Sequence, residues 1–349
     1  MAYKMLIMGA SYGSLLGPKL ALAGHDVTLV CLPEEVTLFN AEGARIRMKP
    51  KGYSDFIELN SQDGPGRLDA CGPDDADVMA YDVVGLAMQE PQYRAETVRN
   101  LLARVAAARK PCVSIMNMPP LPFLARIAPG AQDALRAAFT DASVWDGFEP
   151  GLVTLASPDP QAMRPPEEPL NVLQVNLPTN FKVAAFEDPT HTAMLREMEA
   201  DITSYLHGPD GIELPVKLKV FDSLFVPLAK WAMLVTGNYR CITGGDPISI
   251  KEAVHDDIEL SRRIYDAVCD LCIQLGAAQG DMVPFQKYAT AAESLIRPSS
   301  AARALAGGAP FIERLDKVAA ALADAEGIDI PTLAGTTALV DQKLAQNRA

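Results

Sequence analysis

The stretch that decides the fold covers residues 4–30 and reads KMLIMGASYGSLLGPKLALAGHDVTLV. Within it, Tyr3–Met8 is a short apolar run that ends at a glycine, which predicts a fully buried strand. Ser14–Ala23 carries leucines on one helical face and also ends at a glycine, a typical helix stop. Asp26–Cys31 is apolar and β-branched, which predicts a second buried strand. The order strand, glycine turn, helix, strand forms a βαβ unit, whose strands pair in parallel by default.

Strands and helices continue to alternate beyond this unit. Tyr81–Met88 and Cys112–Met116 are continuous apolar runs, typical of strands that are buried on both faces, and Tyr93–Ala108 between them is helical. Residues 60–79 are rich in Asp, Gly and Pro, and we expect an exposed loop there. This pattern predicts an α/β protein with an N-terminal Rossmann-like, doubly wound parallel sheet. The further expected strands are Arg45–Met48, Phe56–Leu59, Leu152–Ala156, Asn171–Val175 and Lys182–Phe186. We expect the three that follow residue 140 to extend the sheet.

From about residue 220 the pattern becomes helical. A length of 349 residues suggests about two domains. We therefore place a Rossmann-like dinucleotide-binding domain at 1–215 and an all-α domain for substrate binding and dimerisation at 216–349. The expected helices of the second domain are Phe221–Thr236, Ser249–Leu275, Met282–Ile296, Pro310–Ala325 and Pro331–Gln346.

Composition excludes several classes of function. The net charge of −13 argues against a nucleic-acid or anionic-membrane partner. No uncharged apolar run reaches the ~18 residues that span a bilayer. The six cysteines form no disulfide framework, and Cys269 and Cys272 lie inside a predicted helix without the further ligands of a metal site. We expect a cytoplasmic protein without a bound metal, and a homodimer whose contacts cover the long apolar helices of the C-terminal domain.

The Gly9–Ser14 turn is the first candidate site. In a dinucleotide-binding fold, glycines in this turn let the backbone approach the pyrophosphate, and the helix that follows offers free N–H groups. The string is one residue shorter than the usual GxGxxG spacing, and an ordinary turn that binds nothing is the alternative. The residues expected to contact the cofactor are Gly9, Ser11, Tyr12, Gly13 and Ser14.

The ends of the later strands supply further candidates, because ligands of open α/β sheets bind there. Leu32 follows the second strand, and no basic residue comes close behind it to hold a 2′-phosphate, which slightly favours NAD over NADP. Glu34 and Glu35 can reach a ribose, or they can serve as ordinary partners of the helix dipole. Gln89 and Asn117 are polar residues directly after two buried strands; each is a cofactor contact or simply a turn former.

The start of the helical domain is basic, because residues 217–240 hold four basic residues against one acid. The stretch from Phe221 to Arg240 is mainly apolar but carries Lys230 and Asn238 as well. A lysine in an apolar helix can act as an acid or hold a substrate carboxylate, and it can also extend its ammonium to the surface.

The chain resembles the ketopantoate reductase family. The resemblance rests on the opening βαβ stretch, on YDVVGLAM and CVSIMN, on the helix around Trp231, and on Pro298-Ser299-Ser300 with the following FIERLDKVAAALADAEGIDIPT. It covers most of the chain. It implies an N-terminal Rossmann domain, a C-terminal helical domain of the 6-phosphogluconate-dehydrogenase type, and an active site in the cleft between them.

The resemblance also assigns roles to single positions. Leu32 and Gln89 stand where the family has a basic residue, whereas Asn117 keeps the family's cofactor-contacting asparagine. Ser299 matches a serine that contacts the substrate. The family's catalytic lysine, two residues after the tryptophan, falls on Met233.

Three functional positions of the family are therefore displaced. Lys230 and Asn238 are the nearest substitutes for the catalytic lysine and the asparagine that follows it. The family's C-terminal acid falls on Phe311, with Glu313 and Asp316 close by. Without the lysine in register, a general acid worth ~10²–10⁴-fold in rate is missing, which argues against ketopantoate itself as substrate.

These observations predict an NAD(P)-dependent oxidoreductase of ketopantoate-reductase-like type. Its substrate is a small polar or carboxylated carbonyl or hydroxy compound. Lys230 and Asn238 are the expected catalytic residues, and Arg240 and Ser299 the expected substrate contacts. The alternatives are an opine-type dehydrogenase, a divergent member with lyase, isomerase or hydrolase chemistry, and a nucleotide sensor without catalysis, because fold does not dictate function.

Overall fold

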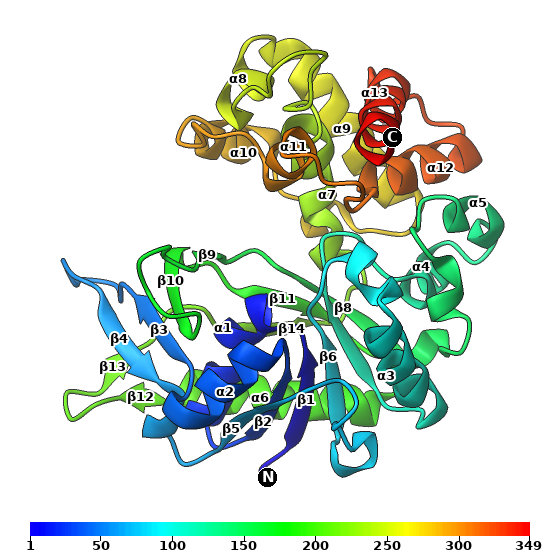
Figure 1. Cartoon of the computed structure of the whole chain (residues 1–349). Coiled ribbons are helices and arrows are strands. Elements are labelled where there is room, and N and C mark those ends of the chain that lie inside the picture. Colours follow the sequence, from blue (N-terminus) through cyan, green and yellow to red (C-terminus); the bar gives the residue numbers. More distant parts are fainter. The chain divides into compact units, whose positions relative to one another are not determined.

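The computed structural model describes residues 1–349 and divides into two compact units, whose elements are labelled in Figure 1. The first, here called the sheet unit, consists of Met1–Met88, Gln92–Met116 and Val144–Asp222. The second, here called the helical unit, consists of Gln89–Pro91, Asn117–Ser143 and Ser223–Ala349.

The main sheet of the sheet unit has eight strands in the order β14-β11-β8-β7-β6-β1-β2-β5. All neighbours pair in parallel except β8 and β11. The parallel order around β1 confirms the predicted Rossmann-like, doubly wound sheet. The strands are β1 (Lys4–Met8), β2 (Asp26–Val30), β5 (Leu68–Cys71), β6 (Val83–Leu86), β7 (Cys112–Ile115), β8 (Val153–Ser157), β11 (Phe181–Ala184) and β14 (Leu218–Phe221).

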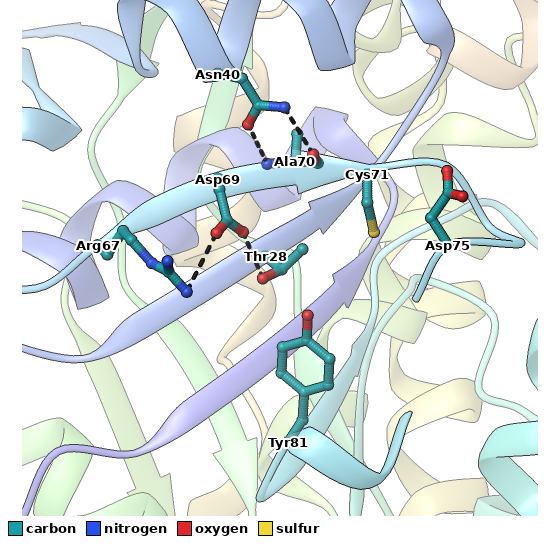
Figure 2. A pocket seen from close by; sticks show the side chains of 8 residues that line it. All are labelled: Thr28, Asn40, Arg67, Asp69, Ala70, Cys71, Asp75 and Tyr81. Atoms are coloured by element: carbon teal, nitrogen blue, oxygen red, sulfur yellow. Dashed lines mark hydrogen bonds and ion pairs between the residues drawn. The ribbon is translucent and has the colours of Figure 1, made fainter. Parts of the chain in front are cut away.

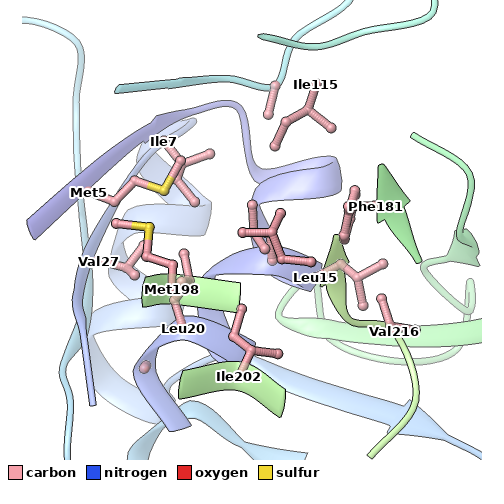
Figure 3. Close-up of a cluster of buried hydrophobic side chains, with 14 of the residues drawn as sticks. Met5, Ile7, Leu15, Leu20, Val27, Ile115, Phe181, Met198, Ile202 and Val216 are labelled. Carbon is pink, nitrogen blue, oxygen red and sulfur yellow. The ribbon is translucent and has the colours of Figure 1, made fainter. Parts of the chain in front are cut away.

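Two helices build the core on one face of this sheet. Leu15 and Leu20 of α1 (Ala10–Leu22) and Met198 of α6 (Pro189–Ser204) pack with strand residues such as Ile7 and Val27, as Figure 3 shows. All five side chains are buried. Almost every residue of α1 is buried, Ser14 and Lys19 included, so the helix lacks the solvent-facing polar side of an amphipathic helix. The other helices of this unit are α2 (Pro33–Glu42) and α3 (Glu96–Ala107).

Two sequence expectations about strands were wrong. The loop expected at 60–79 contains β5, an edge strand of the main sheet in which Leu68 and Ala70 face the core and the residues between them do not. Val172–Leu177 does not extend the main sheet but pairs with the strand Arg45–Met48. This second sheet has the order β4-β3-β10-β9, and short strands β12 and β13 form a hairpin. Their bounds are β3 (Arg45–Met48), β4 (Ile57–Asn60), β9 (Gln161–Met163), β10 (Val172–Leu177), β12 (Leu206–His207) and β13 (Ile212–Glu213).

The helical unit contains no strand. It includes Asn117–Ser143, because α5 packs against α12. No helix in the structure has both the length and the apolar character to cross a membrane. The helices are α4 (Leu121–Ile127), α5 (Gln132–Arg136), α7 (Lys230–Met233), α8 (Ile250–His255), α9 (Ile258–Gln274), α10 (Phe285–Ala292), α11 (Ser300–Ala306), α12 (Leu315–Glu326) and α13 (Leu333–Arg348).

Two helices expected to be continuous are broken. The segment predicted as one helix from Phe221 to Thr236 consists of a 3-10 turn (Val226–Ala229), the short α7, and a π-helical turn (Leu234–Asn238). The helix expected over Ser249–Leu275 splits into α8 and α9, because the Asp257 side chain accepts the Leu260 N–H and starts a new helix. Single π-helical turns often mark functional positions, which directs attention to the first break.

Candidate functional site

A cluster of polar side chains in the helical unit surrounds the Glu313 carboxyl. Glu313 lies on the irregular segment between α11 and α12. The Glu90 backbone N–H points at its Oε1 from 3.4 Å, and the Asn117 side chain hydrogen-bonds its carboxylate. Lys230, the first residue of α7, adds a positive charge nearby. The structure therefore brings two predicted site residues, Asn117 and Lys230, to one carboxyl group.

The pKa of the Glu313 carboxyl is shifted upward into the neutral range. Burial raises its pKa to about 7, and the negative charge of Glu90 adds to the rise. The Glu90 N–H, the Asn117 side chain and the Lys230 ammonium oppose this effect but do not cancel it. A carboxyl group with a pKa near the operating pH is suited to proton transfer.

The backbone on both sides of this carboxyl is held firmly. The Tyr239 hydroxyl donates to the Glu313 carbonyl oxygen at 2.6 Å and accepts the Leu315 N–H at 2.9 Å. The Arg314 guanidinium forms a buried ion pair with Asp316 at 2.8 Å. The two Tyr239 hydrogen bonds tie the segment between α11 and α12 to the helix end that carries Tyr239, so that the carboxyl group keeps its position.

Glu90 is a buried carboxylate with defined partners. The side chain is only 2% exposed and accepts hydrogen bonds from the Thr140 N–H and hydroxyl, both at 2.8 Å. Buried ionised carboxylates require such donors. Sequence reasoning named neither Glu90 nor Glu313 as a site residue. Glu313 stands two positions after the expected acid, and only the displaced family pattern pointed to it.

The predicted substrate contacts Ser299 and Arg240 form hydrogen bonds with groups other than Glu313. Ser299 starts α11: its hydroxyl accepts the Ala302 N–H and donates to the Asn238 backbone carbonyl at 2.7 Å. Arg240 donates to the Ser261 hydroxyl at 2.7 Å and to the Thr236 carbonyl oxygen. Burial lowers the pKa of Arg240. These hydrogen bonds tie Ser299 and Arg240 to neighbouring elements of the helical unit, and their predicted contact with substrate stays a prediction.

The glycine turn in the sheet unit is shorter than expected. The helix α1 begins at Ala10, so Gly9 alone makes the turn, with a φ of 107°. A Cβ at Gly9 would lie 2.8 Å from the Ala87 carbonyl oxygen, which leaves room for glycine only. Gly13 and Ser14 were expected in the turn but lie buried inside the helix. There the Ser14 hydroxyl donates to the Ala10 carbonyl.

The start of α1 nevertheless presents backbone donors. The N–H groups of a first helical turn have no acceptor within the helix, and the N-cap residue, Gly9, has no side chain that could cap them. Ser11 is exposed there, whereas the Tyr12 ring packs edge-on against Phe181, with 6.4 Å between the ring centroids. Tyr12 is thus part of the core contacts of the sheet unit.

The end of β2 carries an exposed apolar side chain and a buried carboxylate. Leu32 is 60% exposed. Glu35 accepts the Leu32 N–H at 3.1 Å and forms an ion pair with Arg164. Arg164 also donates to the Ala10 carbonyl oxygen at 3.2 Å. Sequence reasoning missed Arg164, because 129 residues separate it from Glu35 and no local pattern marks it.

A separate cavity of about 380 Å³ lies beside β2 and β5 (Figure 2). Its side chains pair mainly with each other: Thr28 donates to Asp69 at 2.5 Å, and Arg67 forms an ion pair with Asp69 at 3.3 Å. None of the predicted site residues lines it. Nor does the structure contain a group of three or more His, Cys, Asp or Glu residues that could hold a metal ion.

Comparison with known proteins identifies the fold. Neither a protein-family model nor a curated protein sequence matches the chain. Solved structures match over nearly the whole length. A ketopantoate reductase of the PanE/ApbA family from Ralstonia eutropha has a TM-score of 0.63 and 19% identity, and the match covers 99% of this chain and 100% of that one.

Two further structures agree. The 2-dehydropantoate 2-reductase from Methylococcus capsulatus has a TM-score of 0.67 at 16% identity, over 99% of this chain and 98% of that one. A D-mandelate dehydrogenase with NADH and anilino(oxo)acetate has a TM-score of 0.63 at 13% identity, over 99% and 100%. The chain therefore has the fold of the ketopantoate reductases, as its sequence elements indicated.

Proposed function

We propose that the protein is an NAD(P)-dependent oxidoreductase that reduces or forms a small polar or carboxylated carbonyl compound. The observation that carries this proposal is the Glu313 carboxyl, with a pKa of about 7, beside Asn117 and Lys230. Carbonyl reduction needs a group that donates a proton to the developing alkoxide, together with donors that hold the oxygen. Ketopantoate is excluded from the proposal, because the sequence departs from the family pattern at Met233 and Phe311.

The chain's residues fit a nicotinamide dinucleotide. The N-terminus of α1 follows Gly9, which has no capping side chain, and the N–H groups of such a helix start suit a pyrophosphate. Leu32 offers an exposed apolar surface at the end of β2, where an adenosine binds in this fold class. In the helical unit, Asn117 Oδ1 is buried and has no hydrogen-bond partner, so it can accept from a ligand hydroxyl or amide. Asn117 is thus a proposed cofactor contact, as Gly9 and Ser11 are.

Each residue of the cluster has a separate task in the proposal. The bound nicotinamide supplies or accepts the hydride. Glu313 holds the proton that the substrate oxygen receives, and Lys230 stabilises negative charge on that oxygen. Asn117 donates to the Glu313 carboxylate and restricts its orientation. Glu90 raises the pKa of Glu313 and so keeps the proton available at neutral pH. Asn238, Arg240 and Ser299 remain predicted contacts on which the proposal does not depend.

The preference between the two nucleotides is open to test. The sequence argument for NAD depends on the lack of a basic residue close behind β2. Arg164, however, reaches Glu35 at that point. The homodimer expected from the sequence likewise stays a prediction, which light scattering of the purified protein can check.

A titration decides between the candidate functions. NADH and NADPH are added to the purified protein, nicotinamide fluorescence reports binding, and a panel of 2-keto acids, with and without amines, reports turnover. Binding with turnover of keto acids is the expected result, and turnover that requires an amine would identify an opine-type dehydrogenase. Binding without any turnover would favour a nucleotide sensor. If neither nucleotide binds, the oxidoreductase proposal is refuted in favour of non-redox chemistry.

A further inference from the structure

A cation from a distant part of the chain lies at the proposed dinucleotide site of the sheet unit. Residues 9–18 and 31–44 contain no Lys or Arg. Arg164, directly after β9, fills this gap: its Nη1 pairs with the Glu35 carboxylate, and its Nη2 donates to the Ala10 carbonyl oxygen at 3.2 Å. It thus lies between the first turn of α1 and the start of α2.

The position of this guanidinium is fixed by buried groups. The Glu35 side chain is 9% exposed and also accepts the Leu32 N–H, which ties it to the end of β2. The Arg164 side chain is 28% exposed, so part of it faces outward. A guanidinium has five N–H donors, and the two contacts to Glu35 and Ala10 leave others available for an anion. Arginine is well suited to phosphate, because its planar fork matches the phosphate oxygens.

We propose that Arg164 binds a phosphate group of the dinucleotide and that Glu35 positions it for this task. The inference rests on the proposed function. The phosphate is either the pyrophosphate, which both nucleotides share, or the 2′-phosphate, which only NADPH carries.

The experiment measures NADH and NADPH dissociation constants by nicotinamide fluorescence for the wild type, Arg164→Met and a matched control. Arg47→Gln is that control: Arg47 lies on β3 of the second sheet, is 29% exposed and pairs with Glu58 and Glu168. We expect Arg164→Met to weaken binding about tenfold to a hundredfold, as loss of a charge-assisted hydrogen bond does. We also expect a weaker salt dependence in that variant. Arg47→Gln is expected to bind like the wild type.

The outcomes show which phosphate group of the dinucleotide Arg164 binds. A loss confined to NADPH assigns the 2′-phosphate, and an equal loss for both nucleotides assigns the pyrophosphate; both support the inference. Affinities within twofold of the wild type, or an equal loss in Arg47→Gln, overturn it. If Arg164→Met does not fold, Arg164→Gln keeps a donor for Glu35 and is tested in its place. A wild type that binds neither nucleotide refutes the proposed function as well, whereas intact binding with unaffected variants refutes this inference alone.

Discussion

The Tyr239 hydroxyl donates to the Glu313 carbonyl oxygen at 2.6 Å and at the same time accepts the Leu315 N–H at 2.9 Å. One hydroxyl thus satisfies two backbone groups on either side of Arg314. Burial raises the pKa of Tyr239 well above its ordinary value, so the hydroxyl stays protonated and keeps donating. Since 74 residues separate Tyr239 from Glu313, this bond is a long-range connection between the π-helical turn and the proposed proton donor.

Replacement of Tyr239 by Phe should therefore affect both stability and catalysis. The change leaves the Leu315 N–H and the Glu313 carbonyl without partners, which costs about 1–3 kcal/mol of unfolding free energy. Turnover should fall more than nucleotide affinity, because the Glu313 carboxyl loses its fixed position. Urea unfolding and steady-state kinetics measure the two effects. Tyr265→Phe is the control: its hydroxyl donates to the Val283 carbonyl at 2.8 Å in the same unit, so stability should fall while turnover stays near normal. Equal kinetics in both variants would contradict the positioning role.

Glu313→Gln tests the proton donor directly. The amide cannot release a proton, so we expect turnover to fall by about 10²–10⁴-fold. In the wild type, reduction should slow as the pH rises through about 7, because the carboxyl group then loses its proton. The variant should lack this break in its pH–rate profile. An unchanged profile would remove Glu313 from the reaction.

The same group makes stability depend on pH. The folded pKa of Glu313 is about 7, above the ordinary 4.5, so the folded state binds more protons than the unfolded state between these values. The wild type should therefore lose unfolding free energy as the pH rises from about 4.5 to about 7, relative to Glu313→Gln. Urea unfolding at several pH values measures the difference. A constant difference would mean that the pKa of Glu313 is not raised.

Lys230→Met tests the proposed cation. Its loss should lower turnover by about tenfold or more, since it removes the positive charge that the proposal places beside the substrate oxygen. Nucleotide affinity should stay near the wild-type value, because Lys230 belongs to the helical unit and not to the glycine turn. Lys251→Met, at an exposed position of α8, serves as the control. Wild-type turnover in Lys230→Met would take this residue out of the site.

The sequence predicted the fold well because its signals are local. The apolar runs of β1, β2, β6 and β7 are short, continuous and bounded by turn residues, so each identifies a strand on its own. The edge strand β5 was missed, because only its alternating Leu68 and Ala70 are buried and the surrounding Gly, Asp and Pro residues favour a loop. The break in the helix at 226–238 was missed because the whole segment is apolar, and an apolar run does not show whether it is α- or π-helical.

The candidate site was only partly predictable. Asn117 follows a strand and Lys230 interrupts an apolar helix, so both could be named from their surroundings. Glu90 and Glu313 acquire their role only through burial and through each other, and they are 223 residues apart. Arg164 depends on an ion pair with Glu35, which lies 129 residues away in the sequence. Groups that tertiary contacts bring together carry no spacing in the sequence that could identify them.

Lys19 offers a test of the sheet unit that is independent of the site. It lies inside α1, its side chain is 3% exposed, and its ammonium donates to the Pro215 carbonyl oxygen at 3.0 Å. Burial, with a contribution from Lys217, lowers its pKa to about 7. The unfolded chain, in contrast, keeps this lysine protonated up to about pH 10.5.

Lys19→Met should therefore stabilise the protein at neutral pH. The unfolded state binds more protons than the folded state between about pH 7 and 10.5, so the wild type gains unfolding free energy as the pH rises through this range. At pH 7 the variant should be more stable by about 1–3 kcal/mol, and its advantage should shrink by pH 9, because the buried lysine is then neutral in the wild type. Urea unfolding at both pH values measures this, with Lys51→Met at an exposed position as the control. If Lys19→Met were the less stable protein at pH 7, the bond to Pro215 would outweigh the burial of the charge, and Lys19 would stabilise the fold in its protonated form.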